Sequence, residues 1–333
     1  MVTNEIVIDE RLCHGCGYCV EFCPTHCLEI PIDNISPKGY YQPALTKPEK
    51  CTGCGVCVWM CPHWAIVVNS CSEDQGKAVT REQVAGPPRL AVDPPFAGCS
   101  GCQHPTVGRI VAEVVDELGV AEKAIVLDAI PCATSSAFGL DFGRKLTYDE
   151  NATDLATYVR RNTPNAIVAA VQGYWGLADF SLDVGSLIGA LIRGENITLV
   201  LCNMPYYAPK EGRPSPVSEP AQGRLEPATR INTPEGTKLI MGGHPLHIAE
   251  LAAGFKGVAY SARGAITSVA DYQTTKGYIR NAFKSQMNNA GLSIVEVLCV
   301  CGDLSYSVPV ESLNWVKKRM TAEFPLGEFK TTS

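Results

Sequence analysis

Two runs of cysteines carry the clearest chemistry in this sequence. In each run, three cysteines are separated by two-residue gaps, and a fourth follows after three further residues and directly precedes a proline. The first run is Cys13, Cys16, Cys19 and Cys23, and the second is Cys51, Cys54, Cys57 and Cys61. Glycines inside both runs (Gly15, Gly17, Gly53 and Gly55) permit the positive φ angles of a tight loop. We therefore expect each run to wrap its thiolates around a metal centre.

The spacing distinguishes three kinds of cysteine site. Zinc ribbons use paired CxxC motifs, but not two runs of four cysteines that each end in Cys-Pro. A disulfide framework requires an oxidising compartment, and no secretion signal opens the sequence. The spacing instead matches the bacterial two-cluster ferredoxin run, in which the fourth cysteine of each run ligates the other cluster. It predicts one 4Fe–4S cluster on Cys13, Cys16, Cys19 and Cys61 (cluster 1) and a second on Cys51, Cys54, Cys57 and Cys23 (cluster 2).

Length and composition limit the classes of function. The chain has 333 residues, which suggests about two domains. Its formal net charge of −6 and the absence of a basic run argue against nucleic acid as a partner. No apolar stretch approaches the ~20 residues of a membrane span, so we expect no membrane partner. Sixteen cysteines without a secretion signal predict a reducing cytoplasm, and oxygen-labile clusters favour an anaerobe.

We divide the chain into three segments. Residues 1–72 form the predicted ferredoxin domain, which is so short that the clusters must supply much of its folding energy. Residues 73–95 contain Gly86-Pro87-Pro88 and Pro94-Pro95 and are predicted to be an extended, Pro-rich linker. Residues 96–333 form the second domain. Cys27 and Cys71 lie outside the ferredoxin pattern and are expected to be ordinary buried residues.

The second domain alternates strand and helix patterns. Apolar runs typical of buried strands cover residues 124–127, 166–171, 197–202 and 294–300. Helices are predicted over residues 110–118, 182–192, 247–253 and 274–286. This alternation predicts an α/β fold, a parallel sheet with helices on both faces. Ligands of such sheets bind at the carboxyl ends of the strands.

Four more cysteines fall near that edge of the sheet. Cys99 and Cys102 form a CxxC motif before the first long helix, Cys132 follows the first strand, and Cys301 follows the last. Four thiolates from three loops are enough to hold a third cluster (cluster 3). The spacing is less specific here, because CxxC also serves zinc sites and thiol exchange.

The CxxC segment also carries a resemblance. Cys99-Ser100-Gly101-Cys102-Gln103-His104 resembles the Cys-Pro-Gly-Cys-Gly-His signature of the β subunits of 2-oxoacid:ferredoxin oxidoreductases. Residues 193–198, 283–286, 293–298 and 325–330 also follow this family, so the resemblance extends from about Gly98 to the C-terminus. It implies a thiamine-diphosphate-binding fold. By position, it implies that cluster 3 lies nearest the active site and is ligated by Cys99, Cys102, Cys132 and Cys301, whereas Cys202 and Cys299 are packing residues.

The resemblance further implies a reaction and partners. In this family the β subunit binds thiamine diphosphate through Mg²⁺, and an α subunit completes the site, with a γ subunit as a further candidate partner. The complex converts a 2-oxoacid and coenzyme A to acyl-CoA and CO₂. The thiamine cofactor supplies the carbanion chemistry, and electrons leave through the clusters to a soluble ferredoxin or a similar carrier.

The implied metal site departs from the family pattern. The family's Gly-Asp-Gly appears here as Gly173-Tyr174-Trp175, and its Asn-Asn as Asn203-Met204. Mg²⁺ demands octahedral oxygen ligands, and a phenol and a thioether are poor substitutes. Asp179 and Asp183 are alternative oxygen donors, although their segment has the pattern of a helix start with solvated aspartates.

Two further elements that face the thiamine in the family have changed as well. The family's His-Gly-Arg appears as Asp149-Glu150-Asn151, and its Thr-Gly-Gly-Gln as Lys210-Glu211-Gly212-Arg213. We interpret these changes as loss or replacement of thiamine diphosphate and Mg²⁺. The candidate pocket residues are His104, Gly173, Tyr174, Asn203, Tyr207, Lys210 and Arg213.

Two functions follow as hypotheses. The first is a β subunit of a 2-oxoacid:ferredoxin oxidoreductase with an unusual metal site. The second is a redox module whose pocket binds another anionic ligand directly through Lys210 and Arg213, because both side chains bind anions without an intervening metal. A purely structural paralogue is disfavoured by the twelve cysteines that match cluster ligands. Thiamine content of the purified complex separates the first two.

Overall fold

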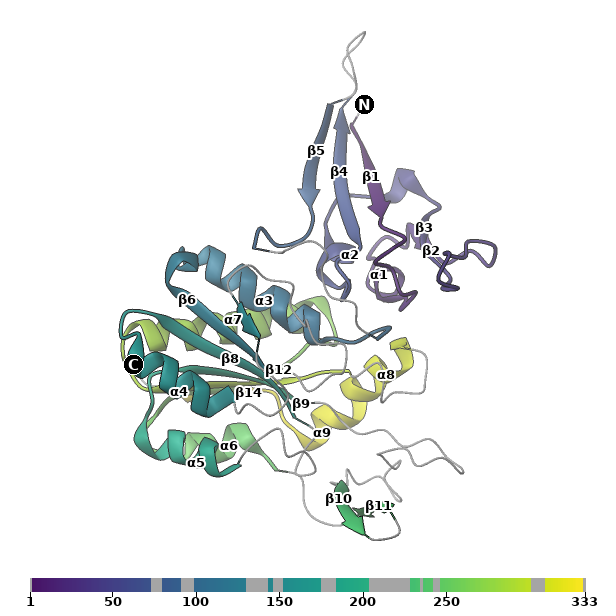
Figure 1. The fold of residues 1–333 in the computed structure, drawn as a ribbon. Helices are drawn as coiled ribbons and strands as arrows, with labels where there is room; N and C mark the ends of the chain where they lie inside the picture. The colour runs from purple at the N-terminus through teal and green to yellow at the C-terminus, as the bar shows by residue number, and fades with distance from the viewer. Residues whose placement is uncertain are drawn as a thin grey trace.

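A computed structural model describes residues 2–72, 80–90, 99–129, 143–145, 152–174, 184–203, 228–233, 236–241, 246–300 and 309–331. Figure 1 shows a large sheet between two layers of helices, with a smaller N-terminal sheet packed above one of these layers. Among the helices of these ranges, none is both long and apolar enough to cross a membrane.

The large sheet has seven strands in the order β14-β12-β13-β9-β8-β6-β7. Neighbouring strands run parallel, except that β14 is antiparallel to β12. The predicted α/β fold is therefore confirmed. The strands are β6 (Ala124–Ala129), β7 (Gly143–Lys145), β8 (Ile167–Tyr174), β9 (Thr198–Asn203), β12 (Val258–Ala265), β13 (Leu292–Leu298) and β14 (Gly327–Thr331).

Helices cover both faces of this sheet because its central strands bury side chains on both sides. In β8, Ala169 and Val171 belong to one apolar core and Val168 and Ala170 to the other, as the two-residue period of a strand requires. The helices α3 (His104–Glu117) and α7 (Val269–Met287) pack over the first face. The second face is covered by α4 (Ala152–Asn162), α5 (Val184–Arg193) and α6 (Ile248–Ala253).

Strand β12 is the main element of the sheet that the apolar pattern did not predict. Tyr260, Ser261 and Arg263 interrupt its apolar character, yet every one of its residues is buried. The remaining described elements of the second domain are a hairpin of β10 (Ala228–Thr233) and β11 (Gly236–Met241), a 3₁₀ turn over Ala121–Lys123, and a C-terminal segment of α8 (Pro309–Trp315), a π-helical turn (Val316–Met320) and α9 (Thr321–Glu323).

The N-terminal part is a three-stranded antiparallel sheet with two one-turn helices beneath it. Its strands are β1 (Val2–Ile8), β4 (Ile66–Ser72) and β5 (Thr80–Ala85), in the order β1-β4-β5. The helices α1 (Tyr18–Glu21) and α2 (Val56–Trp59) each begin within a cysteine run. A second, two-stranded sheet joins β2 (Leu28–Glu29) to β3 (Ala44–Leu45), and a 3₁₀ turn spans Pro48–Lys50.

Part of the segment assigned to the linker is in fact a paired strand. Thr80–Ala85 forms β5, which pairs with β4 at the edge of the ferredoxin sheet. Its residues are mostly exposed and polar, as is common for an edge strand, so the sequence carried no apolar alternation to reveal it. The other linker residues that the structure describes, 86–90, have no regular secondary structure.

The two parts share one packed interface. Val56 and Met60 of the ferredoxin part belong to the same apolar core as Val107 of α3. The ring of Trp59 stacks on that of Tyr272 in α7, with centroids 6.4 Å apart. Arg109 of α3 is almost fully buried and donates from Nη1 to the carbonyl of Gly86 at 3.2 Å. The ferredoxin part is thus fixed against α3 and α7 by side-chain packing.

Candidate iron–sulfur centre

The structure gathers each predicted ligand set of the ferredoxin part around its own cavity. One small cavity is lined by Cys13, Cys16, Cys19 and Cys61, together with His14 and His63. The other is lined by Cys23, Cys51, Cys54 and Cys57, together with Cys27. The exchange of the fourth cysteine between the two runs is therefore visible in the fold.

Glycines shape the loops that carry these cysteines. Gly15, Gly17, Gly53 and Gly55 all have positive φ, between 63° and 79°, as predicted. Gly17 and Gly55 are the residues directly before α1 and α2, so each loop turns sharply into its helix. A Cβ at Gly15 would lie 2.7 Å from the carbonyl oxygen of Tyr41. A side chain at that position would push the first loop away from the backbone of Tyr41.

The donor sets fit iron–sulfur clusters better than single ions. Across the described ranges, no three His, Cys, Asp or Glu side chains converge closely enough to hold one metal ion. The four cysteines of each set instead surround a cavity. Burial, reinforced by neighbouring cysteines, raises the pKa of the Cys57 thiol to about 12. Four thiolates in such a place need a cationic core to stabilise them, which the irons of a cluster supply.

Cys27 is buried as expected, but its position beside a predicted ligand was not foreseen. Its sulfur lies 3.4 Å from the sulfur of Cys23, and its backbone N–H donates to the same sulfur at 3.5 Å. In the other run, the backbone N–H of Ala65 donates to the Cys61 sulfur at 3.4 Å. The one available signal was the offset within the repeat, because Cys27 and Ala65 both stand four residues after the fourth cysteine.

The CxxC segment before α3 is a compact turn. The backbone N–H of Cys102 donates to the carbonyl of Cys99 at 3.1 Å, and Gly101 between them has a φ of 73°. Gln103 donates from its backbone N–H to the carbonyl of Val300 and accepts from the N–H of Val300 at 2.9 Å. The turn is thereby fastened to the residue before Cys301. Cys132 and Cys301 themselves lie outside the described residues.

The loop of the first cysteine run contacts this CxxC turn directly. Ser100 donates from its hydroxyl to the carbonyl of His14 at 2.8 Å. Tyr18, which is 1% exposed, lies within hydrogen-bonding distance of the Gly101 carbonyl, at 3.1 Å from its hydroxyl. The same hydroxyl is 3.3 Å from the carbonyl of Pro309 in α8. The cavity of Cys13, Cys16, Cys19 and Cys61 is therefore the one whose binding loop abuts Cys99 and Cys102.

The candidate pocket is described only in part. Gly173 and Tyr174 end β8, and the register pairs Tyr174 with Asn203 at the end of β9. His104 is fully buried at the start of α3, and burial lowers its pKa to about 4. Tyr207, Lys210 and Arg213 lie outside the described residues, as do Trp175, Met204 and both alternative oxygen donors, Asp179 and Asp183.

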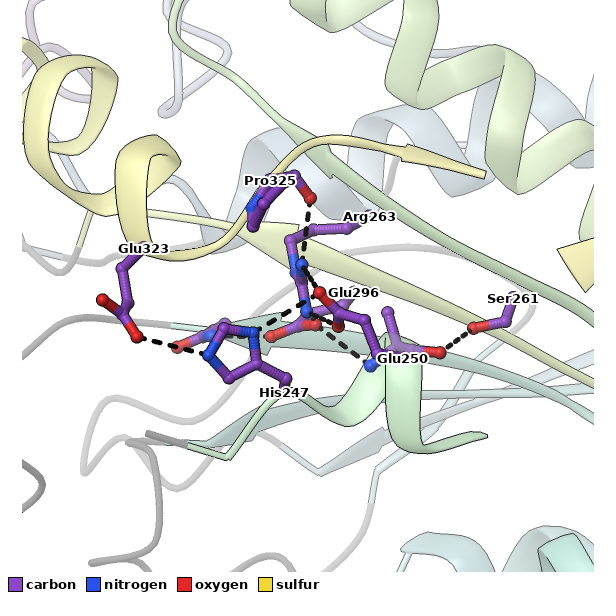
Figure 2. A network of polar contacts seen from close by, with 9 residues as sticks. His247, Glu250, Ser261, Arg263, Glu296, Glu323 and Pro325 are labelled. Atoms are coloured by element: carbon purple, nitrogen blue, oxygen red, sulfur yellow. Dashed lines mark hydrogen bonds and ion pairs between the residues drawn. The ribbon is translucent and has the colours of Figure 1, made fainter. Parts of the chain in front are cut away.

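Asn203 is held by a buried charged network. Its side-chain nitrogen donates to Glu296 Oε1 at 2.7 Å. The other carboxylate oxygen of Glu296 accepts from Arg263 Nε at 2.8 Å, and both residues are fully buried. Figure 2 shows Arg263 between Glu296, Glu250 and the carbonyl of Pro325, which joins β12, β13, α6 and the C-terminal segment. The sequence signal for this network was Glu296 itself, a charge inside an apolar strand.

Arg263 favours the charged form of Glu250 in this network. Burial opposes ionisation of Glu250, yet its hydrogen bond to Arg263 and the charge of that guanidinium hold the pKa of Glu250 below its usual value. The guanidinium also lies 5.3 Å and 5.1 Å from the ring centres of Phe324 and Phe329. Asn203 is consequently part of a stabilising network.

The ends of β8 and β9 do not by themselves fit a Mg²⁺ site for a diphosphate. The register pairs Tyr174, where the family pattern has an aspartate, with Asn203, whose side-chain nitrogen donates to Glu296 and whose amide oxygen is the one side-chain oxygen it could offer a metal. Neither of these two strand ends supplies a carboxylate, and Mg²⁺ demands a near-octahedral set of oxygen ligands.

Comparison with known proteins identifies one domain and distant relatives of the chain. A 4Fe-4S dicluster domain family matches residues 12–65. The "ketoisovalerate oxidoreductase subunit VorA" of Methanothermobacter thermautotrophicus is 26% identical over 235 residues, which cover 71% of this chain and 48% of that protein. The corresponding subunit of Methanothermobacter marburgensis is 25% identical over the same shares. The chain thus spans about half the length of the curated relatives it matches.

A solved structure supports the fold. The "2-oxoglutarate:ferredoxin oxidoreductase from Magnetococcus marinus with 2-oxoglutarate, coenzyme A and succinyl-CoA bound" aligns with a TM-score of 0.50 and 19% identity, over 74% of this chain and 85% of that chain. At this identity the likeness concerns the fold alone. Taken with the sequence matches, the chain carries a 4Fe-4S dicluster domain and is a distant relative of the subunits of 2-oxoacid:ferredoxin oxidoreductases.

Proposed function

We propose that this chain is an iron–sulfur electron-transfer subunit of the β type in a complex of the 2-oxoacid:ferredoxin oxidoreductase kind. It moves low-potential electrons between a site at the carboxyl ends of its strands and a ferredoxin-like carrier. The observation that carries the proposal is the direct contact between the first cysteine loop and the Cys99–Cys102 turn, through Ser100 and Tyr18. An α subunit completes the site at the strand ends.

In the proposed function, the clusters follow one another along a route for electrons. Cys99 and Cys102, with Cys132 and Cys301, would hold cluster 3, and the Cys16 loop beside them would hold cluster 1. Cys54 of the second set is exposed, so its cavity suits contact with an outside carrier. When bound, such clusters act as electron carriers whose potentials the surrounding protein sets. The chain's own contribution is to bury Cys13, Cys19 and Cys102 from water and to fix the loops against one another.

A second candidate concerns the ligand at the strand ends. The ends of β8 and β9 supply no carboxylate to hold Mg²⁺, so this version has an anionic ligand other than thiamine diphosphate. In this version Lys210 and Arg213 bind the anion directly, as their side chains bind phosphates and carboxylates elsewhere. The chain still carries electrons to that site.

Thiamine content separates the two versions. We expect calorimetry of the intact, anaerobically purified complex to show no tight binding of thiamine diphosphate that depends on Mg²⁺, because the ends of β8 and β9 supply no carboxylate for the metal. The same complex is assayed for ferredoxin reduction with a panel of 2-oxoacids and coenzyme A, beginning with ketoisovalerate and 2-oxoglutarate, the acids named for its relatives. Tight Mg²⁺-dependent binding, unchanged by Lys210→Ala and Arg213→Ala, together with turnover of one acid, would establish the ordinary family reaction instead.

A further inference from the structure

The two cluster cavities differ in side chains that surround otherwise matching scaffolds. The two cysteine runs superimpose in sequence at a constant offset, so that Cys51 corresponds to Cys13 and Cys61 to Cys23. At this offset, His14 corresponds to Thr52, and Thr25 corresponds to His63. Because the fourth cysteines are exchanged, both histidines line one cavity and both threonines line the other.

The backbone at the matching positions is nearly the same. His26 and Trp64, which also correspond, have φ angles of 50° and 53°. The fourth cysteine of each run accepts a backbone hydrogen bond from the residue four positions later, at 3.5 Å and 3.4 Å. The difference between the cavities therefore lies in their side chains.

His63 is a buried side chain whose ring nitrogens lack a hydrogen-bond partner among the described residues. It is 2% exposed. Its ring contacts that of His14, with centroids 4.1 Å apart, at the wall of the cavity formed by Cys13, Cys16, Cys19 and Cys61. An imidazole carries at least one N–H in either protonation state, and a buried N–H without an acceptor is costly. The neighbouring cavity is where sulfur acceptors would lie.

Thr25, the counterpart of His63, already has such a neighbour. Its hydroxyl oxygen lies 3.6 Å from the sulfur of Cys23, the ligand contributed to the other cavity. This position in the repeat therefore directs a polar side chain at a cluster ligand in one cavity. His63 occupies it in the other cavity with a longer, nitrogen-based donor.

We propose that His63 donates an N–H hydrogen bond to a sulfur of cluster 1, either an inorganic sulfide or a ligand thiolate, and thereby raises the reduction potential of that cluster. Adding one electron increases the negative charge on the sulfurs, and a hydrogen-bond donor stabilises the reduced form more than the oxidised form. No proton is transferred and no other reactant is needed. The inference requires only the two clusters of the dicluster domain, so it stands apart from the proposed reaction.

The first test is a redox titration of the full chain, purified anaerobically and followed by electron paramagnetic resonance. We expect His63→Thr, which installs the residue of the other repeat, to lower one midpoint potential by about 59 mV, a tenfold change for a one-electron couple. His63→Gln retains an N–H donor and is expected to keep most of the potential. His26→Asn removes an exposed histidine at a residue where asparagine tolerates positive φ, and it is expected to change nothing. Unchanged midpoints in a fully loaded His63→Thr protein would overturn the proposal.

A second readout needs no variant that might fail to load its clusters. In wild-type protein labelled with ¹⁵N-histidine, pulsed paramagnetic resonance of the reduced clusters should detect a weakly coupled histidine nitrogen. The coupling should weaken or vanish in His63→Thr and persist in His26→Asn. Absence of any histidine nitrogen coupling in the wild-type protein would refute the hydrogen bond.

Discussion

Replacing Cys16 with alanine is expected to cut electron flow between the ferredoxin side and the Cys99–Cys102 turn. Cys16 belongs to the ligand set whose loop abuts that turn, so its loss removes cluster 1 from the middle of the proposed route. We expect the rate at which cluster 3 is reduced to fall by at least about 100-fold, since loss of even an outer-shell partner typically costs 10–100-fold. The assay mixes reduced ferredoxin anaerobically with the oxidised chain and follows each cluster by freeze-quench paramagnetic resonance.

A matched control is available on the same domain. Cys71 is a buried cysteine of β4 that belongs to neither ligand set, so Cys71→Ala should leave all cluster signals and rates near wild type. In Cys16→Ala, cluster 2 should still be reduced, because its ligands line a separate cavity. Reduction of cluster 3 at the wild-type rate in a Cys16→Ala protein that lacks cluster 1 would contradict the proposed order.

Replacing Glu296 with alanine is expected to destabilise the second domain by about 3–5 kcal/mol, the usual cost of removing one partner from a buried ion pair. Arg263 would remain buried with its Nε unpaired, and Asn203 would lose its acceptor. The free energy of unfolding is measured by denaturant titration of the anaerobic, cluster-loaded chain. The surface pair of Asp9 and Arg11 provides the control, since Asp9→Asn should cost at most about 1 kcal/mol.

Acidification should weaken the same network. The folded pKa of Glu250 lies below its unfolded value, so its contribution to stability is present above the unfolded pKa and is lost as pH falls through the folded pKa.

A Glu296→Ala protein whose unfolding free energy stays within about 1 kcal/mol of wild type would show that the network contributes little.

The sequence predicted those features that depend on local spacing. The two groups of cysteines that line the cavities follow from gaps between cysteines, and the strands β6, β8, β9 and β13 follow from continuous apolar runs. Strand β12 was not predicted because its apolar pattern is interrupted by Tyr260, Ser261 and Arg263. These polar side chains are buried because they form hydrogen bonds with residues of other elements. Strand β5 was not predicted because an exposed edge strand needs no apolar face.

The contacts between distant segments were beyond reach of the sequence pattern. In the sequence, Tyr18 is an ordinary residue of a cysteine loop. In the structure, its hydroxyl lies near the carbonyl of Gly101 in the CxxC turn, 83 residues further along the chain. Asn203 reads as the remnant of a metal motif, and only the structure reveals its bond to Glu296. Both examples depend on which loops the fold brings together, which residue spacing alone does not encode.

The central claim is that a third cluster stands between the ferredoxin domain and the strand ends, and iron content tests it most directly. Anaerobic iron and sulfide analysis of the full chain should find about twelve irons, and Cys102→Ala should lower this to about eight. Cys202→Ala, which removes a fully buried cysteine of β9 that is not a predicted ligand, should retain about twelve. A wild-type chain with about eight irons, unchanged in Cys102→Ala, would contradict the account.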